Sequence, residues 1–237
     1  MFDAPVLRPT KAQAEYLVTD LNSLAPEGMD PTLAATIPLN TTTASLALDH
    51  LPLRPRDTLL ATGAVGAVGG YALELARTRG VRIVAQGQPE DEEYLRSRGA
   101  TWFVSRDEEP GAAVRQLVPG GVDGVLDAAA LGAPAMAAAR DGGVYVSVRL
   151  DVLPAPERGV VVRHTAAGPD APRLAYLSAL AEVGVLTPRV AEVYPLAQAR
   201  RGPRPAGPGR SARPDRPGSV SSGPARGTAR SRSWSPR

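Results

Sequence analysis

The sequence has no cysteine and only two histidines, His50 and His164. Without cysteine the chain cannot form disulfide bonds, thiolate metal ligands or a cysteine nucleophile. Each histidine stands alone in the sequence, and such a residue is more often a packing or surface residue than a ligand, so we expect no metal site. No run approaches the roughly 20 apolar residues of a membrane span, and residues 1–10 lack the basic-then-apolar order of a signal peptide. These absences predict a cytoplasmic protein without a membrane partner.

Aromatic residues are also scarce, at 4% of the 237 residues, but hydrophobic residues make up 43%, which is enough for a core. The net charge of +3 is unevenly spread, because residues 201–237 hold nine arginines and one acid while the rest is mildly acidic. This basic segment is rich in proline, glycine and serine, so we predict a disordered tail. Its arginines would suit a nucleic acid. We favour a solvated appendage or an out-of-frame reading of GC-rich DNA, and expect no nucleic-acid partner.

A glycine-rich bend at residues 63–70 is the most informative motif of the chain. The apolar residues 58–62 predict a buried strand before it, and the pattern over 71–80 predicts a helix after it. A second strand at 81–85 then closes a β-α-β unit within about 30 residues. A helix that starts directly after a strand presents free N–H groups at the positive end of its dipole, which suits a diphosphate. The bend therefore predicts a dinucleotide cofactor and redox chemistry.

The bend matches the dinucleotide fingerprint G-x-G-x-x-G with one change. The aligned positions are Ala64, Gly66 and Gly69, so alanine replaces the first glycine. Glycine matters here because a Cβ at the closest approach would push the phosphate away. The alternative interpretation is a glycine loop that only allows close helix–strand packing. The strand–turn–helix context favours the cofactor.

Strands and helices alternate along the rest of the chain. Such alternation demands a parallel sheet covered on both faces, so we predict an α/β fold with a Rossmann-type doubly wound parallel sheet. A helix with a hydroxyl cap is expected over 41–48, and a strand outside the main sheet over 190–194. The other predicted strands are 101–104, 122–127, 144–148 and 159–163, and the other predicted helices are 89–99, 108–117, 133–140 and 171–184.

The order and spacing of these motifs resemble the medium-chain dehydrogenase/reductase superfamily, in its zinc-free, quinone-oxidoreductase-like branch of the alcohol dehydrogenase-like proteins. The resemblance covers about residues 14–200. It rests on Ala14-Glu15-Tyr16, Ile37-Pro38-Leu39, Thr43-Ala44, Thr62-Gly63-Ala64-x-Gly66-x-Val68-Gly69, Arg98-Gly99-Ala100, Gly121-Val122-Asp123 through Asp127, Gly142-Gly143 and Tyr194-Pro195-Leu196.

The resemblance implies a two-domain enzyme, in which a GroES-like catalytic domain is built from both ends of the chain around a nucleotide-binding domain. This chain departs from that pattern at both ends, so we expect it to be truncated there. The expected parts are a remnant of the GroES-like β domain with its linking helix at 1–45, the Rossmann domain at 46–168, a helix and return strand at 169–200, and the tail at 201–237.

The resemblance also implies a nicotinamide cofactor. An NAD enzyme usually ends its second strand with a carboxylate that binds the ribose 2′-OH. Residues 85–88 read Ala-Gln-Gly-Gln, with no carboxylate to repel a 2′-phosphate, so NADP is favoured and NAD stays possible. Glu90 and Asp91 stand where related proteins often carry a basic residue, and Arg106 could substitute for it.

The residues that would contact the cofactor are assigned by resemblance. The segment 66–68 would face the diphosphate, Gln86 would border the adenosine ribose, and Ala128 and Ala129 would flank the nicotinamide. Asp127 lies near the same crevice, and we interpret it as a turn or cap residue. The full predicted set is Thr43, Gly66, Ala67, Val68, Gln86, Ala128 and Ala129.

Three functions remain open at this point. The first is an NADP-dependent oxidoreductase that transfers a hydride to a small-molecule quinone, enone or related carbonyl. The second is a catalytically inactive nucleotide-binding remnant, and the third is a nucleic-acid-associated protein acting through its basic tail. No side chain is identified as a catalytic acid or base, and the acidic cluster at 90–93 is interpreted as a solvated helix start. By resemblance the protein could form a homodimer.

Overall fold

The structure, a computed structural model, describes residues 29–190 and 192–193. By its internal contacts the chain divides into two units, Met1–Arg204 and Pro205–Arg237, and all described residues belong to the first. The predicted disordered tail at 201–237 and most of the predicted GroES-like remnant at 1–45 lie outside the described residues. Their assignment stays a prediction.

A parallel sheet of six strands forms the centre of the described region, in the order β3-β2-β1-β4-β5-β6. Each neighbouring pair in this order is parallel. This is the strand order of a doubly wound dinucleotide-binding sheet, so the predicted α/β Rossmann-type fold is confirmed. The strands are β1 (Thr58–Thr62), β2 (Arg82–Gly87), β3 (Trp102–Ser105), β4 (Val122–Asp127), β5 (Ala139–Ser147) and β6 (Val161–His164).

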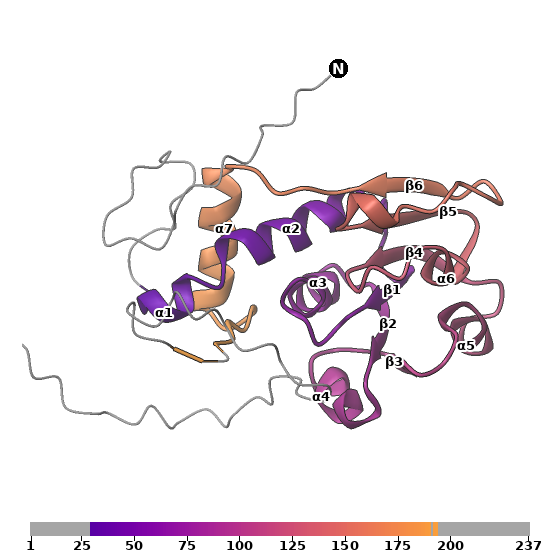
Figure 1. The fold of residues 1–237 in the computed structure, drawn as a ribbon. Helices are drawn as coiled ribbons and strands as arrows, with labels where there is room; N and C mark the ends of the chain where they lie inside the picture. The colour runs from indigo at the N-terminus through magenta and orange to yellow at the C-terminus, as the bar shows by residue number, and fades with distance from the viewer. Residues whose placement is uncertain (1–28, 191, 194–237) are drawn as a thin grey trace, which may run out of the picture. The chain divides into compact units, whose positions relative to one another are not determined.

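Helices cover both faces of this sheet (Figure 1). The helices α2, α3 and α7 lie on one side, and α5 and α6 lie on the other. The helices are α1 (Pro31–Ala34), α2 (Pro38–Asp49), α3 (Ala67–Thr78), α4 (Glu92–Ser97), α5 (Pro110–Leu117), α6 (Ala133–Met136) and α7 (Ala171–Glu182), with short 3-10 helices η2 (Pro89–Asp91) and η3 (Leu150–Val152).

Each face of the sheet has its own apolar core. Along β1, Leu59 packs into the core under α2, α3 and α7, whereas Leu60 packs into the core under α5 and α6. Successive side chains of a strand point to opposite faces, so a central parallel strand is buried on both sides. All five residues of β1 are accordingly buried. This burial fixes the carboxyl end of β1, where the glycine bend begins.

The helix predicted over 133–140 is shorter than expected. It ends at Met136, and β5 begins at Ala139, which pairs with Val122 of β4. The alanine-rich sequence has high helix propensity, but tertiary pairing overrides it. Gly121 allows this approach, because it has a φ of +96° and a Cβ there would lie 2.6 Å from the carbonyl oxygen of Ala138.

The hydroxyl cap predicted for the helix over 41–48 is wrong. The helix α2 begins at Pro38, and its N-cap Ile37 makes no side-chain cap bond. The hydroxyl of Thr41 instead donates to the carbonyl of Ile37 one turn earlier, at 2.7 Å. The proposed domain boundary at 45/46 therefore falls inside a continuous helix.

The strand predicted over 190–194 does not form in its described residues. Residues 190, 192 and 193 have no strand conformation, and the other two lie outside the described residues. In the part of the chain that the structure describes, no helix is both long and apolar enough to cross a membrane.

Candidate functional site

The turn from β1 into α3 is made by Gly63 rather than by Ala64. Gly63 has a φ of +56°, in the left-handed region that favours glycine. Ala64 is fully buried, and its N–H donates to the carbonyl of Gln86 on β2 at 3.1 Å. The tight-turn role of the first fingerprint glycine is therefore filled one residue earlier, which explains why alanine is tolerated at position 64.

The other two fingerprint glycines bring the helix close to the strand. Gly66 is the N-cap of α3 in an extended conformation, and a Cβ there would lie 3.0 Å from the carbonyl oxygen of Gly63. A Cβ on Gly69 would overlap that oxygen outright. Gly69 thus permits the helix–strand contact, as expected of the last glycine of this motif.

The N-terminus of α3 presents main-chain amides at the carboxyl edge of the sheet. Gly66 supplies no side-chain cap and the first turn contains no acidic residue. Ala67 is exposed and Val68 is half-buried. The first hydrogen bond of the helix runs from the N–H of Gly70 to the carbonyl of Gly66, at 2.8 Å. Amides before the first intrahelical bond, at the positive end of a helix dipole, form a favourable environment for an anion.

Asp127 connects the strands that border the bend. It is fully buried at the end of β4, and its carboxylate accepts hydrogen bonds from the hydroxyls of Thr62 and Tyr145, both at 2.6 Å. It also accepts the N–H of Gly132 at 2.8 Å. The hydroxyl of Thr62 in turn accepts the N–H of Ala129 at 3.0 Å. One carboxylate thereby fixes the loop after β4 against the end of β1.

This network changes the interpretation of Asp127 and adds two residues to the site. Sequence reasoning treated Asp127 as a turn or cap residue and did not assign a role to Thr62 or Tyr145. The available signal was an acid that ends an apolar strand, since a buried carboxylate needs donors. Burial, followed by the contact with Asp127, raises the pKa of Tyr145 well above its ordinary value. Tyr145 therefore stays protonated and donates to the carboxylate.

The structure brings the predicted residues of the bend and of the loop after β4 together. A Cβ on Gly63 would lie 3.3 Å from the backbone nitrogen of Ala129 and 3.4 Å from the carbonyl carbon of Ala128. Segment 66–68, predicted to face the diphosphate, begins the helix beside this contact. Gly63 therefore joins the bend to the loop that contains Ala128 and Ala129.

Two other predicted residues are placed differently. Gln86 lies within β2, which extends to Gly87, and only 3% of Gln86 is exposed. Thr43 lies on α2, where its hydroxyl donates to the carbonyl of Leu39 at 2.7 Å. The hydrogen bonds around the bend do not include Thr43. Arg106 directly follows β3, and its N–H donates to the carbonyl of Gly87, the last residue of β2, at 2.7 Å.

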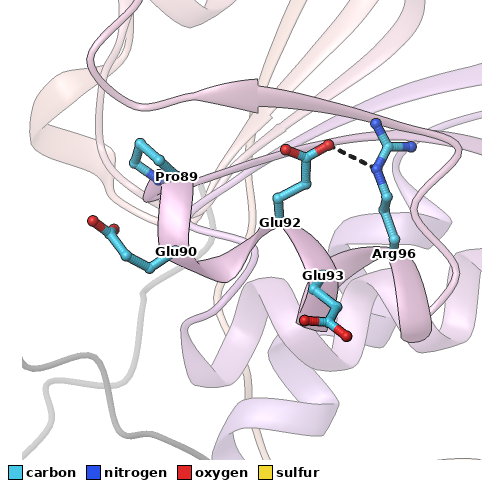
Figure 2. Close-up of a pocket in the computed structure, with 5 residues that line it drawn as sticks. All are labelled: Pro89, Glu90, Glu92, Glu93 and Arg96. Carbon is cyan, nitrogen blue, oxygen red and sulfur yellow. Dashed lines mark hydrogen bonds and ion pairs between the residues drawn. The ribbon is translucent and has the colours of Figure 1, made fainter.

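The acidic cluster after β2 surrounds a surface pocket (Figure 2). Glu92 pairs with Arg96 one turn later at 2.8 Å, and the N–H of Gln88 donates to the carboxylate of Asp91 at 3.2 Å. These contacts agree with the interpretation of a solvated helix start. The pocket is lined by Pro89, Glu90, Glu92, Glu93 and Arg96.

The described residues contain no group of three or more histidine, cysteine, aspartate or glutamate side chains that could hold a metal ion.

Comparison with known proteins gives partial matches, and no protein-family model matches the chain. The chain is 33% identical over 144 residues to alcohol dehydrogenase 2 of Caenorhabditis elegans, covering 57% of this chain and 41% of that protein. It is 37% identical over 109 residues to the probable acrylyl-CoA reductase AcuI of Escherichia coli, covering 43% and 34% respectively. It is 34% identical over 123 residues to quinone oxidoreductase-like protein 2 of Mus musculus, covering 49% and 35%.

Solved structures share the fold. The crystal structure of AibC matches with a TM-score of 0.67 at 24% identity, covering 75% of this chain and 57% of that one. A mycobacterial protein solved in complex with NADPH matches with a TM-score of 0.60 at 24% identity, covering 74% and 61%. The chain spans less than half the length of the curated relatives it matches.

Proposed function

We propose that this chain, whose homologues are alcohol dehydrogenase and quinone-oxidoreductase-like members of the medium-chain dehydrogenase/reductase superfamily, is an oxidoreductase that binds a nicotinamide cofactor at its glycine bend. These relatives support the superfamily predicted from the sequence, and the zinc-free branch stays a prediction. The observation that carries the proposal is the uncapped N-terminus of α3, placed against the loop after β4 at a point where the strand order reverses. Open α/β sheets bind their ligands at such a point.

The residues present fit the diphosphate of such a cofactor. Gly66 places no side chain at the start of α3, and the main-chain amides of residues 67–69 supply donors there. The loop at 128–132 would border the nicotinamide, and the Asp127 network holds that loop in one conformation. The bound nicotinamide would carry the hydride, and the chain's own residues would position it.

We favour NADP as the cofactor. The residues that end and follow β2 are Gly87 and Gln88, so the strand itself carries no carboxylate at the position where NAD enzymes bind the ribose 2′-OH. The carboxylate of Asp91 lies nearby and accepts the N–H of Gln88. Arg106 is held beside Gly87 by its backbone and could approach a 2′-phosphate. The mycobacterial structural neighbour was solved with NADPH, which is a property of that protein.

The proposed substrate is a small quinone, enone or related carbonyl. This class follows from the relatives, one described as quinone-oxidoreductase-like and another as an acrylyl-CoA reductase. The cytoplasmic location and the homodimer stay predictions. An inactive nucleotide-binding remnant is the competing function, and only a turnover assay separates the two.

The experiment has two stages. NADPH fluorescence is titrated with the protein, and NADPH oxidation is then followed with a quinone and with an enone. Gly66→Asp should abolish binding because it places a negative charge against the diphosphate. Gly168→Asp is the matched control, since a Cβ at Gly168 meets nothing within 4 Å. Unchanged affinity in Gly66→Asp would contradict the site, and binding without oxidation would identify the inactive remnant.

A further inference from the structure

The segment 184–190, which we call the strap, follows α7 and is fastened to α3. Leu186 is 1% exposed and belongs to the core that α3 helps to form. The N–H of Thr187 donates to the carboxylate of Glu74 on α3 at 3.0 Å. Glu74 is itself buried and pairs with Arg98 at the end of α4. The strap is thereby held beside both α3 and α4.

The strap places the charge of Arg189 at the glycine bend. Its Nη2 donates to the carbonyl oxygen of Val65 and, at 3.3 Å, to that of Gly66. The guanidinium carbon lies 5.6 Å from the centroid of the Tyr94 ring on α4. A Cβ on Gly70 would lie 3.3 Å from the same Nη2. The guanidinium is therefore held by neutral groups of the bend and of α4.

These contacts locate Arg189 near the carboxyl end of β2. A Cβ on Gly87, the last residue of β2, would lie 3.2 Å from Cγ2 of Val65. Val65 thus lies over the end of the strand, and its carbonyl binds Arg189. Dinucleotide-binding units place the adenosine ribose at the end of the second strand, and an arginine nearby accommodates a 2′-phosphate.

We propose that Arg189 sets the preference for the phosphorylated cofactor by binding its 2′-phosphate, an inference that rests on the proposed function. A guanidinium already held by hydrogen bonds and an aromatic ring loses little freedom when it binds. Arg106 is exposed, so it would have to be ordered on binding. Of the nearby acids, Asp91 accepts the Gln88 amide and Glu92 pairs with Arg96.

The test compares dissociation constants for NADPH and NADH in four variants, measured by fluorescence titration. Arg189→Gln should weaken NADPH binding by about tenfold or more, because a charge-assisted contact is lost, and change NADH binding by less than about twofold. Arg189→Lys should recover part of the NADPH affinity. Arg106→Gln and Arg96→Gln each remove one positive charge nearby, and both should change the NADPH-to-NADH ratio by less than about threefold.

The outcomes separate this inference from the proposed function. If Arg189→Gln lost affinity for NADPH and NADH equally, Arg189 would only stabilise the conformation of the bend, and the inference would be overturned. If Arg106→Gln instead abolished the preference for NADPH over NADH, Arg106 and not Arg189 would be the residue that binds the 2′-phosphate. If the wild-type protein binds NADH but shows no preference for NADPH, the specificity inference fails while the cofactor site stands. Binding of neither cofactor would overturn the proposed function itself.

Discussion

The polar network around Asp127 gives the candidate site its rigidity at the scale of single residues. Thr62 is the central link, because one hydroxyl donates to Asp127 and accepts the amide of Ala129. An unpaired buried carboxylate oxygen or amide is costly, whereas a satisfied one contributes little net energy. The network therefore matters more for the position of the loop after β4 than for the total stability.

Thr62→Val should test this network. The substitution keeps the shape of the side chain but leaves the Ala129 amide and one oxygen of Asp127 without their partner, so we expect the free energy of unfolding to fall by about 2 kcal/mol. Urea denaturation measures the loss. Thr62→Ser keeps the hydroxyl and should lose less than half as much; equal losses in the two variants would show that the methyl group, not the hydrogen bonds, matters.

Tyr145 gives the site an alkaline pH dependence. Burial and Asp127 raise the pKa of Tyr145 in the folded state above its ordinary value of 10.0. Below that pH both states hold the proton, but at higher pH only the unfolded state releases it. The free energy of unfolding should therefore fall as pH rises above about 10, with this one group contributing up to about 1.4 kcal/mol per pH unit.

Tyr145→Phe should remove this contribution. Urea unfolding at a series of pH values between about 8 and 11 should give a shallower alkaline slope for the variant than for the wild type. Tyr71, whose pKa burial also raises, remains in both proteins, so it cancels in the comparison. Parallel slopes would show that Tyr145 ionises as readily in the folded state as in the unfolded one.

Sequence reasoning found the main-chain part of the site more readily than its side-chain part. The bend could be predicted because the glycines, the strand and the helix are local in sequence. Arg189 could not, because its hydrogen-bond partners Val65 and Gly66 lie more than 120 residues away. The side-chain partners of Asp127 come from two other strands, β1 and β5, so only the sheet order shows that they meet.

At the scale of elements, the crossing of α3 over β1 depends on a single missing side chain. Gly69 and Gly70 are neighbours in the same helix, and both should gain helix propensity when replaced by alanine. A Cβ on Gly69 would overlap backbone atoms of Gly63, whereas a Cβ on Gly70 would lie 3.3 Å from the flexible end of Arg189 and in ordinary contact, at 3.5 Å, with the carbonyl oxygen of Ala64. Because both alanine substitutions should raise helix propensity, a difference in stability between Gly69→Ala and Gly70→Ala would report the steric overlap at Gly69.

Gly69→Ala should therefore be destabilised by about 2 kcal/mol or more relative to Gly70→Ala, because overpacking forces the backbone to shift. Denaturant unfolding of both variants measures the difference, and cofactor titration shows whether the displaced bend still binds. Similar stability of the two variants would mean that the bend can move away from α3 at no cost.

The predicted elements were most accurate where burial dictates the sequence. The strands β1 and β4 have the predicted bounds, 58–62 and 122–127, because both lie in the centre of the sheet, are almost entirely buried and have apolar middle residues. The start of β5 could not be predicted, since Ala139 belongs to an alanine-rich run and becomes a strand only by pairing with Val122. The failed cap of α2 has a local cause, because Pro38 starts the helix before the threonines.

At the scale of the whole molecule, the candidate site lies at the junction of the two halves of the sheet. The bend belongs to β1 and α3, the proposed ribose position to β2, and the loop after β4 to the other half. A cofactor bound along this edge would contact all three. Its binding energy should therefore add to the stability of the entire sheet rather than to that of one loop.

Cofactor binding should accordingly raise the melting temperature of the whole described unit in one transition. At a free NADPH concentration about 100 times the dissociation constant, the expected gain is about 2.7 kcal/mol, or roughly 5–10 °C for a domain of this size. Calorimetry with and without NADPH measures the shift. Gly66→Asp should show none, while Gly168→Asp should match the wild type. Since the shift needs no turnover, it should appear whether the protein is an active enzyme or a remnant, and its absence in the wild type would remove the cofactor site for both.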